Sequence, residues 1–197
     1  MADRGRPRAF DRDAALRRAM EVFWERGYDG ASMSELTSAM GINTPSLYAA
    51  FGDKEALFRA AVELYGAHEG GRTARALREE PTARAAIEAM LRDNVAVYTT
   101  PGTPQGCMVV LAGGTYTERT ASVREFLVDA RRATSASIRD RLEAGLAAGE
   151  LPPGTDPAAL AAFYTSVLFG LSVQARDGAS HAELTAAVDC AMAAWPG

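Results

Sequence analysis

Apolar residues recur every three or four positions along most of the chain, the spacing that places them on one side of an α-helix. Leu16, Met20 and Phe23 give the first clear example, and the same spacing returns from Val123 to Leu146. No segment alternates between apolar and polar residues as a half-buried strand would. The pattern predicts an all-α protein of about nine helices, at about residues 11–26, 33–40, 44–50, 53–67, 82–99, 105–112, 119–148, 157–176 and 180–194.

Local signals support these boundaries. Ser32 and Glu35 have the spacing of a capping box, in which each side chain satisfies a free backbone amide of the first helical turn. The stretch 66–81 contains two adjacent glycines and ends at Pro81, so it is expected to interrupt the helical pattern. The other candidate N-caps are Asp11, either Asn43 or Thr44, and Asp53.

Residues 32–51 form two short predicted helices joined by a turn at Gly41. Such a helix-turn-helix places its second helix in the major groove of DNA. The chain is therefore expected to divide into a basic arm at 1–10, a DNA-binding domain at 11–56 with its core at 32–51, and a helical ligand-binding and dimerisation body at 57–197.

Charge is distributed unevenly along the sequence. The formal net charge is −4, yet residues 1–18 contain six arginines and three aspartates. A basic end on an acidic protein fits local contact with a polyanion better than binding along the whole surface. The arm, with Arg4, Arg6 and Arg8, is expected to reach the minor groove beside the site; the alternative is an ordinary solvated terminus.

The segments FWERGYDGASMSELTSAMGI and NTPSLYAAFGDKEALF, with Leu47-Tyr48, Phe51 and Lys54 at characteristic offsets, make the chain resemble the TetR family of bacterial transcriptional regulators. The specific part of this resemblance covers residues 10–65, and the body matches in its helical plan. The resemblance implies a dimeric, ligand-responsive repressor that binds double-stranded DNA. It also implies that the Tyr48 hydroxyl contacts a phosphate.

The predicted recognition helix carries small side chains, which let its backbone approach base edges closely. Lys54 is the only lysine of the chain and opens the next helix, where a DNA phosphate would balance its charge. The residues expected to contact DNA, besides the three arginines of the arm, are Ser32, Ser34, Thr44, Pro45, Ser46, Tyr48, Ala49 and Lys54.

The last two predicted helices carry wide apolar stripes. In the resembling family such a pair meets its copy in a four-helix bundle, which implies a homodimer and a near-palindromic operator. The alternative is that both stripes serve the core of one chain. The residues expected at the dimer interface are Leu160, Val167, Gly170, Leu171, Leu184, Val188 and Met192.

The helices of the body are expected to surround a pocket for a small-molecule effector whose identity the sequence leaves open. Cys107 stands near the start of a short apolar helix, which suggests a reactive thiol that senses oxidants or electrophiles; the alternative is a small buried residue. Plain core packing is the alternative for every lining candidate: Asn94, Tyr98, Cys107, Met108, Phe126, Phe163 and Tyr164.

Other classes of protein find little support in the sequence. His68 and His181 have no partner at ligand spacing, Cys107 and Cys190 lie far apart, and no catalytic motif is present, so neither a metal, a cofactor nor an enzyme is expected. A secretory signal and a membrane span are also not expected, which favours the cytoplasm. The competing hypothesis is a helical small-molecule-binding or redox-sensing protein, acting through Cys107, with weak or no DNA binding.

Overall fold

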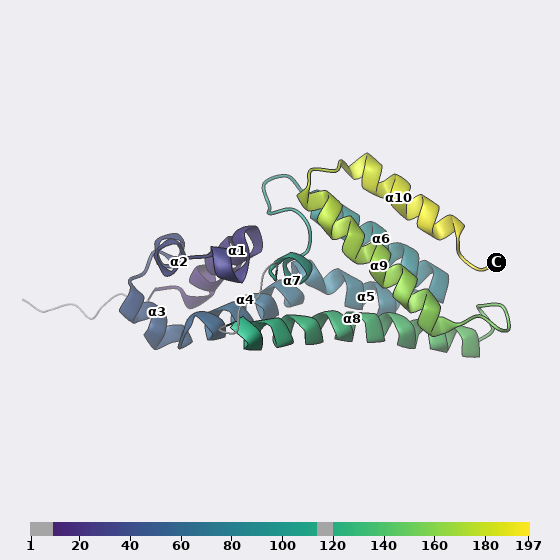
Figure 1. Ribbon diagram of the computed structural model, residues 1–197, viewed down its shortest axis with the longest axis horizontal. Helices are drawn as coiled ribbons and strands as arrows, with labels where there is room; N and C mark the ends of the chain where they lie inside the picture. Colours follow the sequence, from purple (N-terminus) through teal and green to yellow (C-terminus); the bar gives the residue numbers. More distant parts are fainter. Residues whose placement is uncertain (1–9, 114–119) are drawn as a thin grey trace, which may run out of the picture.

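The computed structural model describes residues 10–113 and 120–197, and these residues are helical throughout with connecting loops (Figure 1). The all-α prediction is confirmed. The elements are α1 (Arg12–Gly30), α2 (Met33–Met40), α3 (Thr44–Phe51), α4 (Lys54–Ala67), the 3-10 turn η1 (Glu69–Gly71), α5 (Arg72–Glu79), α6 (Ala83–Tyr98), α7 (Met108–Leu111), α8 (Ala121–Ala147), α9 (Pro157–Arg176) and α10 (His181–Ala193).

Helices α1 to α3 gather around the first turns of α4 and form what we call the head. Its core contains Phe23, Leu36, Leu47 and Phe58, all fully buried. Each of these helices is capped by one of the polar residues that the sequence indicated, and the structure selects Asn43 over Thr44 for α3. The side-chain oxygen of each cap accepts a hydrogen bond from a free amide of the first turn. The observed N-caps are Asp11, Ser32 with its capping box, Asn43 and Asp53.

Helix α1 is kinked at Gly27, which has φ 71° and ψ 179°. The positive φ ends the first helical segment, as glycine commonly does, and the chain then adds a short turn to Gly30. The site is also crowded, since a Cβ at Gly27 would lie 3.1 Å from the carbonyl oxygen of Ala112. The next residue, Tyr28, donates its amide to that same carbonyl at 3.3 Å, so α1 is fastened to the end of α7.

The remaining helices form the body. Helix α4 runs from the head into the body, the long α8 lies along one side, and α9 and α10 cross the opposite side together (Figure 1). Helices α6, α8 and α9 pack on one another, and α10 covers α6 and α9. The centre of the body is filled by apolar side chains such as Ile87, Met90, Leu127, Ile138 and Leu142.

The expected break within 66–81 is present, since α4 ends at Ala67 with a non-helical His68 and the second helical stretch ends at Glu79, but the segment also holds a helix that the sequence did not predict. The segment contains η1 and the two-turn helix α5, of which only Ala76 and Leu77 are buried. Two buried residues among eight give too weak a stripe for a periodicity argument. The two glycines serve close packing instead, since a Cβ at Gly70 would overlap the Tyr65 ring. The short helix expected at 105–112 is also shorter, and forms only at Met108–Leu111.

Candidate DNA-binding face and effector cavity

Helix α3 turns one side to the protein and the other to solvent. Leu47 and Phe51 are buried in the head, while Thr44, Pro45 and Ala49 are exposed and the Tyr48 side chain is 50% exposed. Ser46 lies between the two sides, and its amide donates to the Asn43 side chain at 2.9 Å. Because the exposed residues other than Tyr48 are small, the α3 backbone can approach a flat or grooved partner closely.

Ser32 is engaged within its own helix. Its hydroxyl donates to the Glu35 carboxylate at 2.8 Å and accepts from the Glu35 amide at 3.2 Å. The Ser32 amide, which donates to the Glu35 carboxylate at 3.0 Å, and then the Ser32 hydroxyl lower the pKa of Glu35, and Arg26 pairs with the same carboxylate. Ser32 is therefore a helix cap with an exposed oxygen, and Ser34 in the first turn of α2 is exposed beside it.

Lys54 opens α4 and folds back onto the head. Its ammonium lies 4.4 Å from the centroid of the Tyr28 ring, a cation–π contact. Partial burial lowers the pKa of Lys54, and the charge of Asp29 opposes this shift. Tyr28 therefore positions this ammonium, a role that no spacing in the sequence indicated. Arg4, Arg6 and Arg8 of the expected arm lie outside the described residues.

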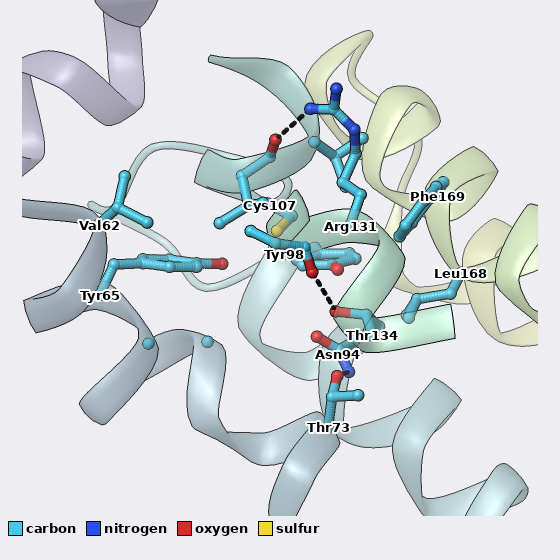
Figure 2. A pocket seen from close by; sticks show the side chains of 15 residues that line it. Val62, Tyr65, Thr73, Asn94, Tyr98, Cys107, Arg131, Thr134, Leu168 and Phe169 are labelled. Atoms are coloured by element: carbon cyan, nitrogen blue, oxygen red, sulfur yellow. Dashed lines mark hydrogen bonds between the residues drawn. The ribbon is translucent and has the colours of Figure 1, made fainter. Parts of the chain in front are cut away.

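A cavity of about 220 Å³ lies among the helices α4 to α9, each of which contributes to its lining. The side chains of Tyr65, Tyr98 and Cys107 come together in it from different parts of the chain (Figure 2). The complete lining is Val62, Tyr65, Gly66, Gly70, Thr73, Asn94, Tyr98, Cys107, Val109, Val110, Ala130, Arg131, Thr134, Leu168 and Phe169.

The polar groups of the cavity are mostly neutral. Burial raises the pKa of Tyr65 and of Tyr98 well above the usual value, and the neighbouring Cys107 thiol raises both further. The Asn94 amide donates to Thr73 at 2.8 Å. Arg131 is the one charged residue of the described lining, and it donates to the Val109 carbonyl oxygen at 3.0 Å. The cavity therefore disfavours cations.

Asn94, Tyr98 and Cys107 line the cavity as expected, but four other candidates need correction. Met108 is buried beside the cavity rather than in its lining. The Phe126 ring lies under the Arg59 guanidinium at 4.5 Å, at the contact between α8 and α4. Tyr164 donates its hydroxyl to the Ala191 carbonyl at 3.2 Å, and Phe163 is 42% exposed on α9. These rings lie on helices that border the cavity, but they point elsewhere.

Comparison with known proteins decides the family. The family model for bacterial regulatory proteins of the tetR family matches residues 15–61, and the model for the tetracyclin repressor-like C-terminal domain matches residues 83–191. The chain belongs to the TetR family. It is accordingly a DNA-binding transcriptional regulator, and the competing hypothesis of a binding protein without DNA contact is not favoured.

Relatives of the TetR family match the chain over nearly its whole length. The transcriptional repressor ComR of Escherichia coli is 33% identical and the repressor BdcR of the same organism 32% identical; each match covers 98% of this chain and at least 90% of the relative. A cysteine mutant of the regulator CifR, solved with 26-bp operator DNA, is 49% identical, with a TM-score of 0.93 over 98% of this chain and all of CifR.

The predicted dimer interface of this TetR-family chain needs correction. Leu171, Leu184, Val188 and Met192 are buried within the single chain, because the apolar stripe of α10 faces α6 and α9. Leu160 and Val167 are partly buried. We define the outer face as the side of α9 and α10 that remains, with the half-buried Gly170 and seven exposed residues: Ala159, Phe163 and Val173 on α9, and Ala182, Ala186, Cys190 and Ala193 on α10.

Helix α9 is apolar on both sides as a result. Among the described helices it is the one long and apolar enough, by length and composition alone, to cross a membrane, with a mean hydropathy of 1.5. Its inner side packs on α6, α8 and α10, so it is a core helix of the body. Its outer side carries Phe163 and Val173, which are 42% and 45% exposed. An apolar face of this kind is typical of a protein–protein contact.

Proposed function

We propose that the protein is a homodimeric repressor that binds a near-palindromic operator and is released by a small molecule held in the cavity. The observation that carries the DNA-binding part is the exposed, small-residue face of α3. The close similarity of the whole chain to CifR solved with operator DNA supports the same head position here. A cytoplasmic location follows from this role.

The test is selection of bound duplexes from a random DNA pool by the purified protein, followed by a gel shift on the selected sequence. We expect one inverted repeat to emerge, with affinity about a thousandfold above bulk competitor at physiological salt. Recovery of no preferred sequence from a folded protein would overturn the proposal.

The outer face is the surface we propose for dimerisation. Phe163, Gly170 and Val173 follow one another along one side of α9, at spacings of seven and three residues, and small residues of α10 are exposed beside them. A Cβ at Gly170 would meet no atom within 4 Å, so the helix backbone itself is open there and a second copy could approach it closely. Two heads related by a two-fold axis would then contact two half-sites.

The cavity limits the effector to a small, mostly apolar molecule without positive charge. A volume of about 220 Å³ corresponds to about seven water molecules, so the effector has on the order of ten non-hydrogen atoms. The Tyr65 and Tyr98 hydroxyls can orient an oxygen atom of such a molecule, and the Asn94 amide oxygen can accept from a hydroxyl, since the Asn94 amide nitrogen already donates to Thr73 and Met90. Screening of small neutral and anionic compounds by thermal shift, with operator release as the second readout, would identify it.

Replacing Lys54 tests the phosphate contact. Lys54→Ala should weaken binding to all duplexes by about three- to tenfold and reduce the salt dependence of log K by about one, because one phosphate contact is lost. Titration of operator DNA at several salt concentrations measures both effects. Arg139→Ala removes one positive charge from α8, where Arg139 pairs with Glu143, and serves as the control. Equal salt slopes for the two variants would exclude the contact.

A second candidate function is oxidant or electrophile sensing by the same regulator. It is favoured by the position of Cys107 in the cavity beside two phenol hydroxyls, although α7 has only four residues and gives little support to the helix-dipole argument. The probe is N-ethylmaleimide, to whose double bond the sulfur adds while the thiol proton ends on the adjacent carbon.

We expect N-ethylmaleimide to lower the operator affinity of the unmodified protein about tenfold or more. The adduct fills the cavity and shifts the equilibrium of the dimer toward head separations that do not match the operator. The comparison uses a Cys190→Ser background, because Cys190 is exposed on the outer face and would itself react. Cys190→Ser alone should respond, and Cys107→Ser, Cys190→Ser should not. An equal loss of affinity in both proteins would show that Cys107 is not the sensor.

A further inference from the structure

Four residues join the head, the loop beside the cavity and helix α9, and we call them the clasp: Trp24, Gln105, Gly106 and Arg176. The Arg176 guanidinium, at the end of α9, donates to the carbonyl oxygens of Trp24 at 2.7 Å, Glu25 at 2.8 Å and Gln105 at 3.0 Å. The Trp24 indole N–H donates to the Gly106 carbonyl oxygen at 2.9 Å, and this hydrogen bond is buried. The clasp therefore ties α1 to α9 and to the loop that precedes α7.

The clasp meets α1 where that helix needs partners. The positive φ of Gly27 ends the first segment of α1, so the carbonyls of the preceding turn lack partners within the helix. Arg176 supplies donors to two of them and brings a positive charge to the negative end of the helix dipole. The end of α1 is thus capped by a residue 152 positions away in the chain rather than by its own sequence.

The other side of the clasp continues into the cavity. Cys107 lines the cavity, follows Gly106 directly, and donates its amide to the Ser172 hydroxyl at 2.8 Å. Gly106 has φ 75°, and a Cβ there would lie 2.5 Å from the Ser172 carbonyl oxygen. Ser172 stands one turn before Arg176 on α9. Residues 105–107 are therefore held between the cavity, α9 and Trp24, with no room to move without disturbing the clasp.

We propose that Arg176 is the residue that positions the DNA-binding head, and that the clasp transmits occupation of the cavity to α1. This inference rests on the proposed function. An occupant that displaces residues 105–107 lengthens the Trp24–Gly106 and Arg176–Gln105 hydrogen bonds. Helix α1 then loses its cap, and the two heads of the dimer sample separations that do not match two half-sites.

The first experiment compares Arg176→Met with Arg92→Met in operator titrations. Arg92 also joins two elements, since it pairs with Glu88 on α6 and Asp189 on α10, but it lies away from the head. We expect Arg176→Met to lower operator affinity about tenfold while circular dichroism shows retained helix, and Arg92→Met to leave affinity unchanged. Equal affinities for the two variants would overturn the inference, while operator binding by the unmodified protein would leave the proposed function standing.

The second readout is one that a purely structural role would not change. Spin labels at Ser38→Cys, an exposed position of α2, in a Cys107→Ser, Cys190→Ser background report the separation of the two heads. Arg176→Met should broaden this distance distribution, and Arg92→Met should not. If Arg176→Met fails to fold, Arg176→Lys and Trp24→Phe take its place; the latter keeps an aromatic ring next to Tyr65 and removes only the indole donor.

A double-mutant cycle tests the link to the cavity. Ala130→Phe adds a ring to the cavity lining and imitates an occupant. It should lower operator affinity in the unmodified protein but have no further effect once Arg176→Met has opened the clasp, because both changes act through the same contact. Independent, multiplicative losses would overturn transmission through the clasp, and so would an affinity unaffected by Ala130→Phe.

Discussion

Gly170→Glu should convert the dimer to a monomer and lower operator affinity at least about a hundredfold, since a single head retains only one half-site and the avidity of two linked heads is lost. In the proposed dimer each new carboxylate would be buried against the other copy near the two-fold axis. Burial of an unpaired charge and repulsion between like charges both oppose association.

The single chain should tolerate this change. A Cβ at Gly170 would meet no atom within 4 Å, and the residue lies within the regular helix α9. Because glutamate has a higher helix propensity than glycine, the substitution should not destabilise α9. Light scattering at micromolar concentration would measure the oligomeric state, and a thermal melt would verify the fold. Gly170→Ala is the matched control, because it also removes the glycine but adds no charge. A dimeric Gly170→Glu protein with normal operator affinity would show that the outer face is not the interface.

The caps of the head helices could be read from the sequence because each depends on contacts within three or four residues. Asp11, Ser32 with Glu35, and Asp53 all cap as their spacing indicates, and only the choice between Asn43 and Thr44 needed the structure. The exposed side of the recognition helix could be predicted for the same reason. The spacing of Leu47 and Phe51 marks the buried side, so the residues on the opposite side are exposed.

The partners of an apolar stripe could not be read in this way. Periodicity identified the stripes of α9 and α10 but not what they pack against, so Leu184 and Val188 were assigned to a second copy although they complete the core of their own chain. The open face was marked instead by small residues such as Gly170 and by Phe163, which had been assigned to the pocket. The lining of the cavity is harder still to predict, because it comes from six helices and from the tightly packed turn at Gly70.

The partners of the clasp residues could not be predicted from the sequence either. Arg176 and Trp24 are 152 positions apart, so no periodicity in the sequence links them. The residues next to Arg176 give no sign that it differs from any other basic residue at the end of a helix. A retrospective signal exists only at Gly27, since a helix that ends at a glycine within a longer helical stretch leaves carbonyls that need a donor from elsewhere. The contacts that join the head to the body are made between residues far apart in the sequence, so they become visible only in the structure.

Ala49→Glu should remove operator binding almost completely, with a loss of at least about a hundredfold, because it brings a negative charge to the centre of the face that enters the groove. Ala49 is exposed on α3 between Tyr48 and the end of the helix, so the single protein loses no packing. Glutamate is also a good helix former, and the melting temperature should change little.

Two control variants separate the effect of the negative charge from the effect of a larger side chain on α3. Ala49→Gln has nearly the same shape without the charge, and should bind more tightly than Ala49→Glu but more weakly than the unmodified protein, since its bulk still holds the α3 backbone away from the bases. Ala148→Glu adds the same charge at an exposed site beyond the end of α8, and should bind normally. Fluorescence anisotropy with labelled operator at two salt concentrations measures all three. If Ala49→Glu bound as Ala148→Glu does, α3 would not be the helix that enters the major groove, and the orientation of the head on DNA would have to be assigned anew.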